Sequence, residues 1–153
     1  MPSSAITIRK AESTDAAHFV QFNQAMAWET ESLKLDEDKI RAGVDGLFAK
    51  PQFGFYVVAE FEGKVAGGLM ITYEWSDWRN KVFWWIQSVY VLPELRGKGI
   101  YRSLYEGVKQ LGRENDCCGF RLYVERTNPL AQEVYKKLGM EESHYLMFED
   151  YQM

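Results

Sequence analysis

The residues best suited to bind a charged ligand stand in one short segment that mixes cations with glycines. It reads Arg96-Gly97-Lys98-Gly99-Ile100-Tyr101-Arg102, in a chain whose net charge is −4. A glycine has no Cβ atom, so its backbone N–H can approach a ligand closely. Consecutive N–H groups at the start of a helix attract anions, because the helix dipole is positive there. Three cations added to such a site favour a ligand with two phosphates.

Two common phosphate-binding motifs do not match this segment. The dinucleotide fingerprint has the form G-x-G-x-x-G, and Arg102 stands where its third glycine belongs. The P-loop requires Lys directly after its last glycine, whereas Ile100 follows Gly99. Close packing explains two glycines at a helix start about as well as ligand binding does. The two mismatches exclude these two classes, and a diphosphate site here would belong to another class.

The flanking sequence predicts a strand, a loop and a helix around this segment. Val82–Val91 is almost continuously apolar, as buried strands are, and Pro93 interrupts it. Residues 97–115 carry apolar side chains at helical spacing, and Phe120–Val124 resembles a further strand. A strand, a crossover helix and a second strand form a parallel pair.

The same patterns predict the other elements. Strands are expected at Ile6–Ile8, Phe55–Phe61, Val65–Trp75 and Tyr145–Phe148. Helices are expected after Ser13-Thr14-Asp15, over Glu37–Ala49 and after Asn128-Pro129. Gly67-Gly68 inside a strand indicates a bulge or a close approach of another backbone. The fold class is α/β, a mixed and mostly antiparallel sheet with one parallel strand pair and no internal repeats.

A second candidate group lies on the last predicted helix. Asn128 is suited to cap that helix, and Pro129 to occupy its first position. Tyr135 follows seven residues after Asn128, beside a predicted buried face of Leu130, Val134 and Leu138, and Gly139 is suited to end the helix.

Both stretches resemble the signatures of the GCN5-related N-acetyltransferase (GNAT) superfamily. The first resembles its acetyl-CoA motif, a hydrophobic strand, a proline turn and R-G-x-G-[IVL]-[GA]. The second, Asn128 to Met140, is similar to N-x-x-A-x-x-x-Y-x-x-x-G-[FM]. The resemblance implies one N-acetyltransferase domain over residues 1–153, with a splayed parallel pair and helices on both faces of the sheet. It also implies acetyl transfer from acetyl-CoA to a primary amine of a small molecule or peptide, directly in a ternary complex.

The resemblance implies roles for individual residues. The backbones of Val89, Tyr90 and Val91 should pair with the pantetheine arm of the cofactor as if it were an added strand. A strand N–H, that of Val89, should donate to the oxyanion that forms during the transfer. Asn128 would contact the cofactor arm or orient the acceptor, and Tyr135 would protonate the leaving thiolate unless it is a core tyrosine. The cofactor-binding candidates are Val89, Tyr90, Val91, Arg96, Gly97, Lys98, Gly99, Ile100, Tyr101, Arg102 and Asn128.

The chain departs from the family pattern at one motif position and lacks an evident base. Tyr101 stands where Gly or Ala is usual, which reshapes the phosphate loop. Gln87, expected on the strand face of Val89 and Val91, can hold a water but cannot accept a proton. A water relay and Glu74 remain alternatives for the base. Acceptor contacts suited to a cationic or aromatic amine are expected from Trp28, Glu29, Glu31, Trp75 and Gln87.

Whole-chain properties exclude several classes of partner. The acidic balance argues against nucleic acid, and no apolar run reaches the length of a membrane span. Residues 1–4 lack the character of a secretory signal, so we expect a cytoplasmic protein, with a homodimer as one assembly state.

Cys117 and Cys118 are adjacent and lack a nearby His, so neither a metal site nor a covalent route is expected. A non-catalytic acyl-CoA sensor is the alternative function.

Overall fold

A computed structural model describes residues 5–153. Residues 1–4, on which the expected lack of a secretory signal rests, lie outside this range. The chain forms two compact units, which meet in sequence between Leu122 and Tyr123. No helix within residues 5–153 combines the length and the apolar character that a membrane crossing requires.

The first unit is built on a sheet that has five strands within the described range, in the order of the chain. They are β1 (Ile6–Lys10), β2 (Gly54–Phe61), β3 (Lys64–Ser76), β4 (Lys81–Val91) and β5 (Gly119–Arg121). Strands β1 to β4 pair antiparallel, whereas β4 and β5 pair in parallel, with Phe83 opposite Gly119. The predicted mixed sheet is confirmed, although β5 ends earlier than expected.

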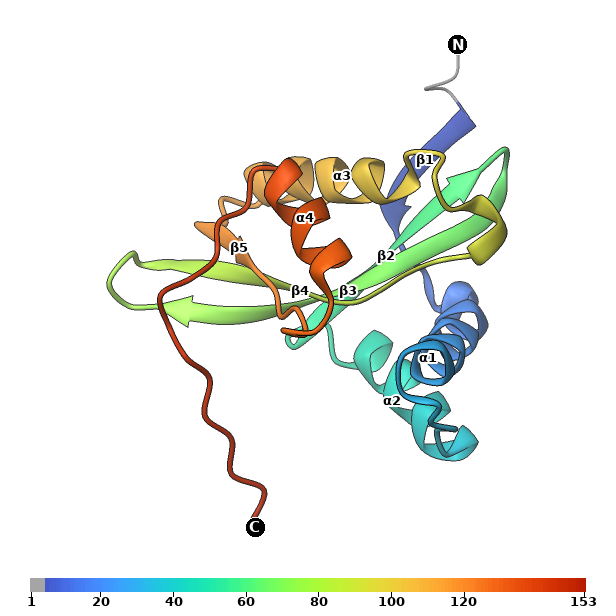
Figure 1. The fold of residues 1–153 in the computed structure, drawn as a ribbon, viewed down its shortest axis with the longest axis horizontal. Coiled ribbons are helices and arrows are strands. Elements are labelled where there is room, and N and C mark those ends of the chain that lie inside the picture. The colour runs from blue at the N-terminus through green and yellow to red at the C-terminus, as the bar shows by residue number, and fades with distance from the viewer. Residues whose placement is uncertain (1–4) are drawn as a thin grey trace. The chain divides into compact units, whose positions relative to one another are not determined.

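Helices cover both faces of this sheet, as predicted (Figure 1). They are α1 (Ala16–Glu31) and α2 (Glu37–Ala49) on one face and α3 (Ile100–Glu114) on the other. Short 3₁₀ turns, η2 (Ser13–Asp15) and η3 (Pro93–Leu95), precede α1 and α3. The Asp36 carboxylate accepts a bond from the Lys39 N–H at 3.0 Å and so caps α2.

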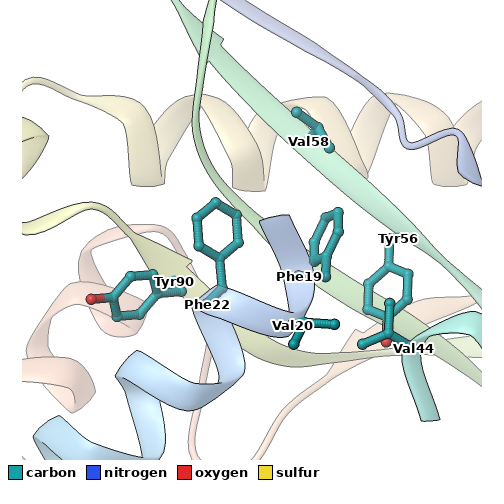
Figure 2. Packing of buried hydrophobic residues seen from close by; sticks show 7 residues of the cluster. All are labelled: Phe19, Val20, Phe22, Val44, Tyr56, Val58 and Tyr90. Carbon is teal, nitrogen blue, oxygen red and sulfur yellow. The ribbon is translucent and has the colours of Figure 1, made fainter. Parts of the chain in front are cut away.

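An aromatic cluster holds α1 and α2 against the sheet. Figure 2 shows its members, which are Phe19, Val20, Phe22, Val44, Tyr56, Val58 and Tyr90. The rings of Phe19 and Tyr56 stack with their centroids 4.3 Å apart. A Cβ on Gly68 would lie only 2.7 Å from the Phe19 ring, so this position in β3 admits no side chain without a shift.

The opposite face of the sheet packs against α3. Val57, Leu69 and Ile71 of the sheet and Leu104 and Val108 of the helix are fully or almost fully buried. The helix comes closest to β1 at Gly107, where an added Cβ would lie 2.6 Å from a methyl group of Ile8.

The glycine pair in β3 lies at a bulge, as predicted. Ala59 pairs with Gly67 and Glu60 with Val65, so Ala66 is an extra residue in β3. A Cβ on Gly67 would lie 2.4 Å from the Tyr90 carbonyl oxygen, which shows that the two backbones also approach closely.

In the second unit, α4 (Pro129–Lys137) begins and ends as predicted. Asn128 caps it and Gly139 follows with φ +96°. The predicted buried face is wrong, because Leu130 is 80% exposed and Val134 is also exposed.

The predicted strand over residues 145–148 is also absent, since residues 140–153 form no helix or strand. A strand requires a partner that completes its ladder of hydrogen bonds, and an apolar helix face requires a surface to pack on. Sequence periodicity shows that a segment can form a strand or an apolar helix face, but it does not supply the surface that either one packs against.

Two glycine-to-alanine substitutions should change stability in opposite directions. Gly46→Ala in α2 places a methyl group in open space and should stabilise the protein by up to about 1 kcal/mol, the usual helix preference. In Gly107→Ala the new methyl group collides with Ile8, and the protein should be destabilised by roughly 1–2 kcal/mol. The cost of overpacking exceeds the gain from the helix preference of alanine. Urea unfolding of both variants measures the difference. A Gly107→Ala protein as stable as Gly46→Ala would contradict the tight contact between α3 and β1.

Candidate functional site

The predicted phosphate-binding segment forms a tight loop between β4 and α3. The 3₁₀ turn η3 (Pro93–Leu95) follows β4, and Gly97 and Gly99 then adopt left-handed backbone angles, with φ +81° and +83°. A Cβ on either glycine would meet no atom within 4 Å. Glycine is therefore required here by the backbone conformation, with open space beside the loop. The left-handed loop also delays the helix, which begins at Ile100 instead of the expected residue 97.

The start of α3 presents positive charge to solvent. Ile100 is buried and anchors the first turn, while Lys98 and Arg102 are exposed. Arg102 lies 3.5 Å from the Glu106 carboxylate, a loose and exposed ion pair, and Lys98 lies 5.9 Å from the centre of the Phe61 ring. Backbone N–H groups of the first helical turn have no partner within the helix. This arrangement suits an anionic ligand.

Arg96, the third predicted cation, is engaged elsewhere. Its Nε donates to the Val91 carbonyl at 2.9 Å, and its Nη2 donates to Glu29 Oε1 at 2.9 Å. The structure therefore places Arg96 at the loop, as predicted, but turns its charge toward a carboxylate of α1.

An extra residue in β4 changes the course of this strand before the loop. Tyr90 pairs with Gly68 and Gln87 with Met70, so Ser88 and Val89 together face one residue of β3. Ser88 adopts φ +52°, which is uncommon for a residue other than glycine. Sequence reasoning missed this bulge, since serine has no particular preference for that conformation.

The parallel pairing of β4 with β5 ends just before the bulge. Its last pair is Trp85 with Arg121, whereas β4 continues to Val91. Within the described range, the backbone of Val89–Val91 therefore lies beyond the region paired with β5. This part of β4 leads directly into the glycine loop.

The bulge also corrects the expected direction of Gln87. A shift of one residue reverses which side chains share a face of a strand. Gln87 pairs with Met70, which packs on the same aromatic cluster as Tyr90, so Gln87 shares a face with Tyr90 and not with Val89 and Val91. Its Nε2 donates to Thr72 Oγ1 at 2.7 Å.

Glu74, one of the two alternatives for the base, is held by strong donors. The Trp85 indole donates to it at 2.8 Å, and Arg121 Nη1 donates to both of its oxygens at 2.9 Å. These bonds, that of Trp85 first, lower the pKa of Glu74, which makes the carboxylate a weaker base. The identity of the base stays a prediction. Arg121 was not among the predicted site residues. The predicted parallel pairing of its strand with Val82–Val91 was the signal that could have found it.

The residues predicted to contact the acceptor are not all alike. Trp28 and Glu31 in the last turns of α1 and Trp75 in β3 are exposed. Glu29 is also exposed, but it accepts bonds from the Tyr90 hydroxyl and Arg96, and these bonds, that of Tyr90 first, lower its pKa. Burial, followed by the bond to Glu29, raises the pKa of Tyr90 to about 12.

The remaining candidates are Asn128 and Tyr135 in the second unit and Cys117 in the first. Asn128 Oδ1 accepts from the Ala131 N–H at 3.1 Å, so its role as a helix cap is confirmed. Tyr135 is half-buried on α4, and its catalytic role stays a prediction. In the first unit, burial is the main cause that raises the pKa of the Cys117 thiol, which keeps it protonated and a poor nucleophile.

Comparisons with known proteins identify the family of this chain. Residues 12–140 match the model of the acetyltransferase (GNAT) family. The thialysine N-epsilon-acetyltransferases of Mus musculus and Sus scrofa are 30% and 29% identical over 147 residues, which cover 88–89% of this chain and 84% of each relative.

One solved structure gives the same assignment, and a more distant one shows the same fold. The crystal structure of a possible acetyltransferase from Clostridium difficile 630 is 41% identical, with a TM-score of 0.91 over 97% of this chain and 99% of that one. The fold of AAC(6')-Iy, solved in complex with a bisubstrate analog, CoA-S-monomethyl-acetylneamine, matches with a TM-score of 0.79 at 18% identity, over 97% and 99% of the two chains.

A family model that matches most of the chain and full-length relatives with an assigned activity decide against a non-catalytic sensor. The chain belongs to the acetyltransferase (GNAT) family, and it is an N-acetyltransferase that takes its acetyl group from acetyl-CoA.

Proposed function

We propose that this enzyme transfers the acetyl group directly to the primary amine of a small molecule or peptide, in a ternary complex of enzyme, acetyl-CoA and acceptor. The observation that supports it most is the course of β4. Its backbone continues beyond the residues paired with β5 and leads into the left-handed glycine loop and the start of α3. A pantetheine arm can pair with such an edge as a strand would, while its diphosphate meets the helix terminus.

The proposed chemistry needs one nucleophile, one oxyanion donor and one acid. The neutral amine attacks the thioester carbon, and the Val89 N–H stabilises the oxyanion. The C–S bond then breaks and Tyr135 gives its proton to the thiolate, while a water relay removes the proton of the amine. The raised pKa of the Cys117 thiol supports a route without an acyl-enzyme.

We further propose that residues 1–153 act as one N-acetyltransferase domain. The match to the family model runs through both units without a break, which supports this reading. Location in the cytoplasm and assembly as a homodimer stay predictions of the same proposal.

The acceptor is expected to be a small primary amine with a cationic or aromatic part. Two kinds of similar protein carry names that include such amines, thialysine and, in the 63-residue match to an enzyme of Salmonella typhimurium, an aminoglycoside. Exposed aromatic faces at Trp28 and Trp75 and the carboxylate of Glu31 suit a cation, with Gln87 as a polar contact.

A thiol-release assay tests the proposal directly. Acetyl-CoA is offered with a panel of lysine analogues, polyamines, aminoglycosides, acidic amino acids and peptides. We expect turnover with cationic small amines to exceed that with acidic acceptors by at least about tenfold, an energy difference of about 1.4 kcal/mol. A preference for acidic acceptors would contradict the acceptor class. Lack of release with every amine would contradict the proposed transfer.

Gly99→Asp should weaken CoA binding by more than about tenfold, since one lost charged contact costs roughly 1.5–3 kcal/mol. The aspartate places a negative charge where the diphosphate is expected. Gly99→Asn is the matched control, because asparagine tolerates the left-handed backbone and adds no charge. Calorimetry with CoA measures both variants. Equal affinities of the folded Asp and Asn variants would show that the loop does not bind the diphosphate.

Tyr135→Phe should lower kcat by about 10–100-fold, the lower part of the range for a positioned acid. The ring stays and only the hydroxyl is lost, so CoA affinity and melting temperature should change little. Tyr145→Phe, which removes an exposed hydroxyl from the same unit, serves as the control. A loss of melting temperature with unchanged kcat per folded molecule would identify Tyr135 as a core residue instead.

A further inference from the structure

We propose that Glu29 is a positioning residue of the acetyl-CoA site, which acts through Tyr90 and Arg96 and does not bind the acceptor. This inference rests on the proposed function and deepens it. It reassigns Glu29 from the predicted acceptor group, which also contained its neighbours Trp28 and Glu31, to the donor side of the reaction. We call the three side chains of Glu29, Tyr90 and Arg96 the Glu29 brace.

The carboxylate of Glu29 is shared between the end of β4 and the loop that follows. Its Oε2 accepts a bond from the Tyr90 hydroxyl, and its Oε1 accepts from Arg96 Nη2 at 2.9 Å. These donors lie 61 and 67 residues away along the chain. One side chain of α1 therefore joins two parts of the candidate donor site.

Arg96 extends the brace to the backbone of β4. Its Nε donates to the Val91 carbonyl at 2.9 Å, and its guanidinium carbon lies 5.2 Å from the centre of the Tyr90 ring. A planar guanidinium that meets a carboxylate, a carbonyl and an aromatic ring has little freedom to rotate. The brace thus fixes the point at which the strand becomes the loop.

Tyr90 provides the rigid end of the brace. Its side chain is only 6% exposed, and its ring lies 5.6 Å from that of Phe22 between centroids. Figure 2 shows the ring beside Phe22, with the hydroxyl directed away from the aromatic cluster. The backbone of Tyr90 is opposite Gly68, immediately after the bulge. A bond to this hydroxyl therefore connects Glu29 to a well-packed part of the sheet.

The brace also determines which cations of the loop are available to the diphosphate. The charge of Arg96 is balanced by Glu29, so Lys98, Arg102 and the backbone N–H groups are left to attract the diphosphate. The Val91 carbonyl, an expected partner of pantetheine, is held by Arg96. Loss of the brace should therefore disturb the pantetheine arm as well as the phosphates.

A direct role with a cationic acceptor fits these contacts poorly. Both oxygens of Glu29 already accept from strong donors, one of them a guanidinium. A bound ammonium would have to compete with Arg96 for the same carboxylate.

The test uses Glu29→Gln and Tyr90→Phe, which keep the size of each side chain, and two acetyl donors. Acetyl-CoA carries the nucleotide phosphates, whereas S-acetylpantetheine does not. We expect each variant to raise the KM for both donors by about 3–10-fold, the effect of one hydrogen bond of about 1 kcal/mol. The KM for the amine should stay unchanged. Arg96→Gln combined with Glu29→Gln should cost less than the sum of the two single variants, because both remove the bond between Arg96 and Glu29.

Matched measurements separate the possible outcomes. Asp45→Asn removes an exposed carboxylate from α2 and should leave both donor KM values unchanged. Thermal melts confirm that each variant is folded. A change in the amine KM alone would overturn the proposal, as would tighter CoA binding by Glu29→Gln, or an effect on acetyl-CoA that spares S-acetylpantetheine. Wild-type protein that binds no CoA would instead contradict the proposed function itself.

Discussion

Ser88 and Val89 of β4 face a single residue of β3, and this mismatch sets the geometry of the donor site. A bulge bends the strand that carries it and increases its twist. The bend comes shortly after the last pair between β4 and β5, at Trp85 and Arg121, where β5 also ends. It also turns the Tyr90 side chain into the aromatic cluster of α1. The course of β4 into the glycine loop and the anchor for α1 therefore depend on the same bulge.

The loop after β4 is shaped by its two left-handed glycines. Because Gly97 and Gly99 both have positive φ, the chain reverses within a few residues and enters α3 without a side-chain cap. Buried Ile100 then fixes the helix terminus against the core. An anion site of backbone N–H groups requires the glycine loop to lie immediately before the first turn of α3, since the helix dipole attracts only a ligand at that turn.

Two of the predicted site carboxylates, Glu29 of α1 and Glu74 of β3, are held by donors. Glu29 accepts from Tyr90 and Arg96, and Glu74 accepts from Trp85 and Arg121, so each has a lowered pKa. A carboxylate with such partners is well suited to hold neighbouring groups in place and poorly suited to accept a proton. For this reason we propose that water removes the proton of the amine and that Glu29 positions its neighbours.

Features that depend on neighbours in the chain were determined by the sequence alone. The bounds of α2, the Asn128 cap and the left-handed Gly139 follow from local hydrogen bonds and backbone preferences, which a short segment carries by itself. The glycine loop before α3 could be predicted for the same reason, and the order of strands followed from their periodicity and connections.

Features that depend on register between distant segments were decided only by the tertiary structure. The bulge at Ser88, and with it the face that Gln87 occupies, arises from how β4 aligns with β3. The bonds of Glu29 required α1 to lie beside the end of β4, and no local pattern encodes that placement. The exposure of Leu130 and the missing strand over residues 145–148 have the same origin, because an apolar or alternating pattern becomes a buried face or a strand only where a partner surface is supplied.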